Sequence, residues 1–145
     1  MWKISENLYS RIRAYYFQRG MQGINSGVYE KLPLSTQQEI ISLIGFNSGE
    51  EDILLASFLK DEYLVVITNE KVYWLSTDST IKSETLENIN RVDFGFANSS
   101  LKNRPFVDCI KIITKDERQF MIKMEAGGPC SSMLNVLGLV IRLNK

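Results

Sequence analysis

The chain contains no histidine among its 145 residues. Histidine is the side chain whose ordinary pKa suits proton transfer near neutral pH, and it is the commonest protein ligand of catalytic zinc. Its absence excludes serine or cysteine nucleophiles activated by histidine, histidine general bases and histidine-bearing metal sites. We therefore expect no enzyme, no catalytic residue, no metal and no cofactor.

Carboxylates are the acid-base groups that remain. Two runs place them side by side, at residues 50–52 and at Asp61 and Glu62. Neighbouring residues on a strand point to opposite faces, and neighbouring residues in a loop are solvated. We therefore interpret both runs as a solvated acidic edge rather than a catalytic pair, which leaves a small enzyme as the third choice of function.

Cysteine is scarce as well, with only Cys109 and Cys130 in the chain. Two thiols do not make the disulfide framework that is typical of small secreted domains. A chain of this length buries about two thirds of the surface that its unfolded form exposes, so it needs neither a disulfide nor a metal to fold. The two cysteines are predicted to be small buried residues in a reducing compartment.

The sequence also lacks a charge excess, since 17 Lys and Arg balance 17 Asp and Glu. Nucleic-acid binding depends on neutralising phosphates, so a neutral chain argues against that class of protein. Residues 1–18 carry Lys3, Arg11 and Arg13 among their apolar residues. This pattern predicts neither a signal peptide nor a membrane span there, and we expect a cytoplasmic protein.

The charges that are present are unevenly distributed. Residues 1–31 contain five basic and two acidic side chains, and residues 32–62 contain one basic and six acidic ones. Near residue 49 the hydrophobic pattern changes from helical spacing to alternation. These changes predict two parts, an N-terminal helical extension over residues 1–48 and a β domain over residues 49–145.

Two helices are predicted in the first part. Apolar residues recur at helical spacing over about Ser5–Gln18, and Gly20 follows as a stop. Ser35 with Gln38 three residues later matches a capping box, so a short second helix is expected to begin there and to end at Gly45.

The second part consists of short apolar or alternating segments separated by turn residues, which predicts strands. The seven predicted strands are Ile53–Leu59, Tyr63–Thr68, Val72–Thr77, Thr80–Thr85, Asn90–Phe96, Phe106–Thr114 and Gln119–Met124. A last amphipathic helix is expected after Gly127, Gly128 and Pro129, because proline suits the first turn of a helix.

The order of seven antiparallel strands and a C-terminal helix resembles the pleckstrin-homology superfold. The segment Tyr63–Leu75 resembles the hairpin of bacterial PH-like and GRAM-like domains, an apolar strand that ends in Thr-Asn before an aromatic strand. Leu86–Ile89 followed by Val92 is similar to their lead into the fifth strand. The resemblance covers about residues 53–143 and implies a mainly β fold, a PH-like seven-stranded antiparallel barrel with a C-terminal helix. Another small β-barrel or an α+β sandwich stays open as an alternative.

The strand over Tyr63–Thr68 has apolar side chains at every position from Leu64 to Ile67, so both of its faces need a cover. The N-terminal helices are the expected cover, with Ile12 and Tyr16 packed against the strand.

Lipid binding is the function that the superfold invites. PH domains that bind phosphoinositides resemble one another in a basic cluster around the loop between their first two strands. Here that loop is Lys60, Asp61 and Glu62, which carries net negative charge. A peripheral lipid-binding domain is therefore the alternative function, and membrane binding is not the first expectation.

Protein binding is the first expectation. The connection Ala97–Pro105 is the longest between predicted strands, and such loops carry function more often than the elements they join. It combines an apolar side chain with polar and positive neighbours, and its predicted partner-binding residues are Leu101, Lys102, Asn103 and Arg104. We expect a non-catalytic interaction domain, an adaptor or a toxin-neutralising immunity protein, and leave homo-oligomerisation open.

Overall fold

The computed structural model describes residues 5–18, 25–45, 52–95, 109–125 and 128–144. Its elements in chain order are α1 (Glu6–Gln18), β1 (Ser26–Val28), the 3-10 helix η1 (Tyr29–Lys31), α2 (Leu34–Ile44), β2 (Ile53–Leu59), β3 (Tyr63–Thr68), β4 (Lys71–Leu75), β5 (Ile81–Thr85), the 3-10 helix η2 (Leu86–Asn88), β6 (Ile89–Gly95), β7 (Cys109–Thr114), β8 (Gln119–Lys123) and α3 (Gly128–Asn144). No helix in these ranges is long and apolar enough to cross a membrane.

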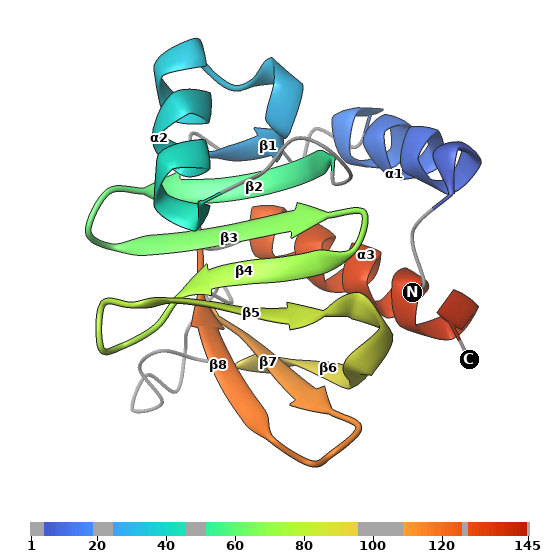
Figure 1. Ribbon diagram of the computed structural model, residues 1–145. Helices are drawn as coiled ribbons and strands as arrows, with labels where there is room; N and C mark the ends of the chain where they lie inside the picture. The colour runs from blue at the N-terminus through green and yellow to red at the C-terminus, as the bar shows by residue number, and fades with distance from the viewer. Residues whose placement is uncertain (1–4, 19–24, 46–51, 96–108, 126–127, 145) are drawn as a thin grey trace.

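The strands form two antiparallel sheets (Figure 1). Strands β1 to β5 follow one another in the first sheet, and β6 to β8 form the second. Helix η2 makes the corner between the sheets, where Leu86 and Ile89 are both buried. Helix α3 follows the second sheet and packs along β6, so that the fold is mainly β with helices on its outside.

Each of the seven predicted strands overlaps an observed strand, but the predicted closed barrel is not confirmed. The described part of the chain contains eight strands, and the ladders divide them five and three. The additional strand β1 pairs its Gly27 with Ala56 of β2. The sequence prediction missed it because Ser26–Val28 holds one large apolar residue, too little to show a period.

Strand β3 is buried on both faces, as its sequence predicts. Tyr63, Val65 and Ile67 belong to one apolar cluster, while Leu64 and Val66 belong to another. This alternation follows from the two-residue period of a strand. The first cluster lies between the sheets and α3, and the second lies beneath α2, so β3 separates two small cores.

The two N-terminal helices pack into different apolar clusters. Helix α2 inserts the fully buried Ile40 against β2 and β3, whereas α1 adds Leu8 and Ile12 to the cluster that holds α3. The expectation that an N-terminal helix covers β3 is confirmed for α2 through Ile40. Helix α1 instead contacts β1 and β2, so the predicted packing of Ile12 directly against β3 is not shown. The side chain of Tyr16 lies outside the described residues.

Helix α2 begins differently from its predicted capping box. It starts at Leu34, with Pro33 at the cap position and no side-chain cap, so Ser35 lies inside the helix. Instead, the side-chain amide of Gln37 donates a hydrogen bond to the backbone carbonyl of Leu32 at 2.9 Å, which connects the first turn of α2 to the preceding chain. The predicted end is confirmed, because Gly45 follows in the left-handed conformation with φ at 63°.

A partly buried polar cluster joins the two sheets beyond the end of β8. Glu125 Oε1 accepts hydrogen bonds from the backbone N–H of Asn25 and from the hydroxyl of Ser26, both at 2.8 Å. The Ser57 hydroxyl lies 2.7 Å from that of Ser26, and the backbone N–H of Glu125 donates to Ser57 Oγ at 3.3 Å. A carboxylate only accepts, so the Ser26 proton points to Glu125 and the Ser57 proton points to Ser26.

At the β5 edge of the first sheet, an ion pair connects it to the second sheet. Arg118, in the turn before β8, pairs with Glu84 of β5 at 3.1 Å and with Asp116 at 2.7 Å. The same guanidinium lies over the ring of Phe120, which contacts Trp74 of β4 at 5.1 Å between centroids. Side chains therefore connect edges that no strand ladder connects in the described residues.

The turn between β7 and β8 is expected to give a pH-dependent contribution to stability. Hydrogen bonds from the Thr114 hydroxyl and then from Arg118 hold the pKa of Asp116 at about 2, below its ordinary 3.8. A lowered folded-state pKa stabilises the fold fully above the unfolded pKa and is lost as pH falls from about 4 towards 2. Asp116→Asn removes this contribution, so its urea unfolding midpoint should fall less steeply over that interval than that of the wild type. Parallel curves for the two proteins would contradict the assignment.

Candidate functional site

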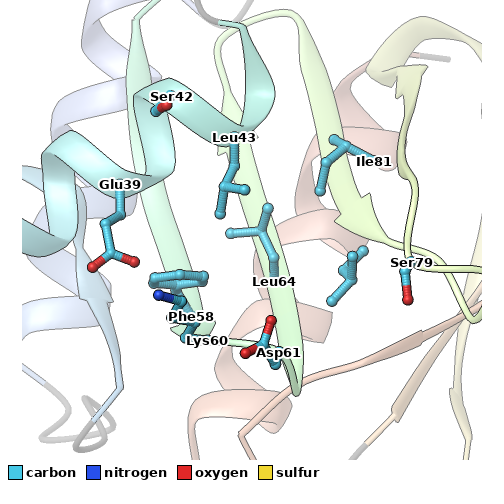
Figure 2. A pocket seen from close by; sticks show the side chains of 10 residues that line it. Glu39, Ser42, Leu43, Phe58, Lys60, Asp61, Leu64, Ser79 and Ile81 are labelled. Carbon is cyan, nitrogen blue, oxygen red and sulfur yellow. The ribbon is translucent and has the colours of Figure 1, made fainter.

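A groove of about 580 Å³ opens between α2 and the sheet beneath it (Figure 2). We call it the α2 groove. Helix α2 forms one wall, and the turns β2–β3 and β4–β5 close one end. Its lining residues are Glu39, Ser42, Leu43, Phe58, Lys60, Asp61, Leu64, Leu75, Ser79 and Ile81.

The groove exists because one short helix covers a wider sheet. A helix with its side chains is about 10–12 Å across, whereas five strands at about 4.8 Å spacing span roughly 19 Å. Ile40 holds α2 over β2 and β3, so the same face of β4 and β5 is only partly covered at Leu75 and Ile81. The sheet therefore presents an apolar floor beside the helix.

Leu43 is the most informative residue of the groove. It points from α2 into the hollow towards Leu64, and Ile81 approaches from the other wall (Figure 2). Its side chain is 47% exposed, although it follows the buried Ile40 by three residues. A leucine placed in a partly filled hollow would gain contacts if an apolar side chain from another molecule entered.

Polar residues stand around this floor. Glu39 and Asp61 bring two carboxylates and Lys60 brings one ammonium, so the rim has one negative charge in excess. Asp61 and Ser79 hold the two turns in the left-handed conformation, with φ at 64° and 66°. In the second turn the Thr80 hydroxyl and N–H donate to Asp78 and lower the pKa of that carboxyl. Hydrogen bonds within the β4–β5 turn therefore stabilise the conformation of this border of the groove.

The polar groups that line the groove in the described part of the chain are two carboxylates, two hydroxyls and one ammonium. Within the ranges that the structure covers, no three His, Cys, Asp or Glu side chains come close enough to hold a metal ion. The serine and carboxylate cluster at Ser26, Ser57 and Glu125 lies elsewhere, and both serines are at most 3% exposed. A substrate cannot reach those hydroxyls, so we assign the cluster a structural role. Burial also raises the pKa of the adjacent Tyr63, which accepts a hydrogen bond from Asn25.

The predicted partner-binding residues Leu101, Lys102, Asn103 and Arg104 lie outside the described residues. The acidic run at residues 50–52 is covered only at Asp52, which is exposed. The predicted burial of the two cysteines is confirmed for both Cys109 and Cys130.

The α2 groove itself was missed by sequence reasoning. The run from Ile40 to Ile44 reads as the core side of a helix, and nothing in it separates the buried Ile40 from the exposed Leu43. The acidic balance of residues 32–62 was the one available signal, since it includes Glu39 and Asp61. Comparison with protein-family models and with curated proteins gives no match to this sequence.

Proposed function

We propose that this chain is a non-catalytic protein-interaction domain that receives an apolar segment of a partner in the α2 groove. The observation that carries the proposal is the half-exposed Leu43 above an apolar floor with a polar rim. An apolar centre surrounded by polar residues is the composition of a protein interface. An adaptor or a toxin-neutralising immunity protein would use such a surface.

The order of elements supports a PH-like fold as part of this proposal. Strands β2 to β5 in one sheet, β6 to β8 in the next and a terminal α3 follow the order of that superfold. The hairpin Tyr63–Leu75 that carries the resemblance forms β3 and β4. The loop between β2 and β3, Lys60 to Glu62, carries net negative charge where lipid-binding PH domains carry a basic cluster. A PH-like fold of this kind is therefore better suited to binding a protein than an anionic lipid.

The rim charges favour a partner of a particular kind. Glu39 and Asp61 attract positive charge, and among the described lining residues only Lys60 opposes them. The segment that we propose therefore carries one or two large apolar side chains next to Lys or Arg. Opposite charges at the edge of an interface mainly speed association and fix orientation, while the apolar contact supplies affinity.

Leu43→Asp should abolish most of this binding. The substitution removes an apolar contact and places a charge in a hollow that the partner would dehydrate, so Kd should rise on the order of tenfold or more. The partner is captured from an extract of the source cells with the wild-type chain, purified, and titrated by calorimetry against each variant. Leu34→Asp is the matched control, because Leu34 is 68% exposed on the same helix and outside the groove.

Other outcomes would place the contact elsewhere. Equal binding by the wild type and Leu43→Asp would overturn the α2 groove as the site. Loss of binding in a Leu101→Ala, Arg104→Ala double variant would then favour the predicted Ala97–Pro105 loop. Flotation with anionic vesicles that is lost in Lys60→Glu would favour the alternative, a peripheral lipid-binding domain.

A further inference from the structure

A second surface, formed by α1, α3 and β6, differs from the α2 groove in charge. Two adjoining hollows of about 460 and 470 Å³ share Asn135 and Arg142 of α3. The first lies between α1, on the right of Figure 1, and α3, which runs from behind the first sheet towards the right, and the second lies between α3 and β6. We call the pair the arginine groove. Its residues are Arg11, Ile12, Asn90, Arg91, Val92, Leu134, Asn135, Val136, Gly138, Leu139, Ile141 and Arg142.

The charge of this groove is of one sign. Arg11, Arg91 and Arg142 all line it, and none of the lining residues that the structure describes is acidic. Arg91 is paired with Asp93 at 3.4 Å, whereas Arg11 and Arg142 have no ion pair within the described part of the chain. Arg142 lies in the last turn of α3, where a cation also suits the helix dipole, but Arg11 lies in the middle of α1 and has no such role.

Gly138 is the second, independent feature of the groove. It lies in the interior of α3, where glycine is the least favourable residue except proline. Packing among the residues that the structure describes does not require it, because a Cβ added there would meet none of their atoms within 4 Å. A helix that keeps an unfavourable glycine over open space leaves room for a close approach from outside. Since Gly138 lines the arginine groove, that approach would come from whatever occupies the groove.

We infer that the arginine groove docks an acidic amphipathic helix of another protein. The partly exposed apolar floor of Val92, Leu134 and Leu139 would receive its apolar side chains, the unpaired guanidiniums of Arg11 and Arg142 would pair with its carboxylates, and Gly138 would let its backbone come near. A helix suits this shape better than a bilayer does, because the floor is recessed between elements and a flat membrane meets protruding side chains. The inference uses none of the residues of the α2 groove, so it stands or fails separately.

The probe is a displayed library of random 16-residue peptides. Peptides are selected on the wild-type chain and depleted on an Arg11→Glu, Arg142→Glu double variant. The recovered pool should be rich in Asp and Glu together with Leu, Ile and Phe at helical spacing. A pool without acidic enrichment would overturn the inference.

The sharper test is Gly138→Ala, measured by anisotropy with one recovered peptide. The added methyl group should weaken binding at least about tenfold by blocking close approach, while the melting temperature rises by about 2–4 °C because alanine favours the helix. Gly45→Ala is the matched control. Gly45 also has open space around it but a φ of 63°, so this change should lower the melting temperature and leave the peptide affinity unchanged. Unchanged binding by Gly138→Ala would overturn the inference.

Charge and alternative occupants are tested with the same peptide. The Arg11→Glu, Arg142→Glu variant should bind at least about thirtyfold more weakly, and more so at low salt. Lys82→Glu with Lys115→Glu changes the net charge equally at exposed residues outside the groove and should have little effect. Equal losses in the two double variants would overturn the inference. So would Gly138-dependent flotation with phosphatidylserine vesicles, which favours a membrane, or Gly138-dependent dimerisation in sedimentation, which favours a second copy.

Discussion

Ile40→Ala is expected to lower the free energy of unfolding by about 2–5 kcal/mol, the usual cost of truncating a buried isoleucine to alanine. Ile40 is fully buried, and it is the one α2 residue in the buried cluster with Ala56, Leu64 and Val66. Its loss leaves a cavity under a helix of only 11 residues that has no side-chain cap. Urea unfolding followed by circular dichroism measures the change as a fall in midpoint at nearly constant slope.

The neighbouring Ile41 provides the control. Ile41→Ala removes the same atoms from a side chain that is 38% exposed, so the loss should be well below that of Ile40→Ala. Equal effects of the two substitutions would show that α2 does not pack on the sheet through Ile40. Because the α2 groove needs α2 in place, Ile40→Ala should also weaken partner binding, whereas Ile41→Ala should not.

Glu125→Ala is expected to have the second large effect. It leaves the part-buried backbone N–H of Asn25 without its acceptor, while the Ser26 hydroxyl can turn to Ser57 Oγ at 2.7 Å, so the loss of the Glu125 hydrogen bonds should cost about 1–3 kcal/mol in all. The two sheets are joined by side chains at this edge, so the variant should also loosen their docking. Hydrogen exchange should then become faster in β1 and towards the end of β2, where Ser57 pairs with Ser26.

Glu62→Ala is the comparison for this cluster. Glu62 pairs with Lys123 at 3.6 Å, and both side chains are about half exposed, so losing that ion pair should cost little. If the Glu125 and Glu62 variants proved equally stable, the buried cluster would not be what holds the sheets together. Glu125→Gln is a milder change, because its amide oxygen still accepts a hydrogen bond.

The α2 groove and the arginine groove show where sequence reasoning stopped. The residues of each come from elements that are far apart in the chain, such as Arg11 with Arg142 and Leu43 with Ile81. A local pattern contains no information on which helix lies beside which strand. The exposure of Leu43 and the open space at Gly138 are likewise properties of the packed molecule.

The sequence by itself determined the local features of this protein. The apolar run at Tyr63–Thr68 predicted a strand that is buried on both faces, and Gly45 predicted the end of a helix that its left-handed conformation confirms. The lack of histidine in the sequence excluded nucleophiles activated by histidine, histidine general bases and histidine-bearing metal sites. These features depend on residue type and on short-range periodicity, which act within one element.

Only the tertiary structure decided how those elements combine. The short strand β1 exists because β2 offers an edge to pair with, and the docking of the two sheets against each other rests on contacts such as that between Asn25 and Glu125, which are 100 residues apart. Helix α2 starts at Leu34 rather than at the predicted capping box, and Gln37 ties its first turn to Leu32. The physical reason is common to all three, since pairing, burial and hydrogen bonding between distant segments depend on which surfaces meet once the chain has folded.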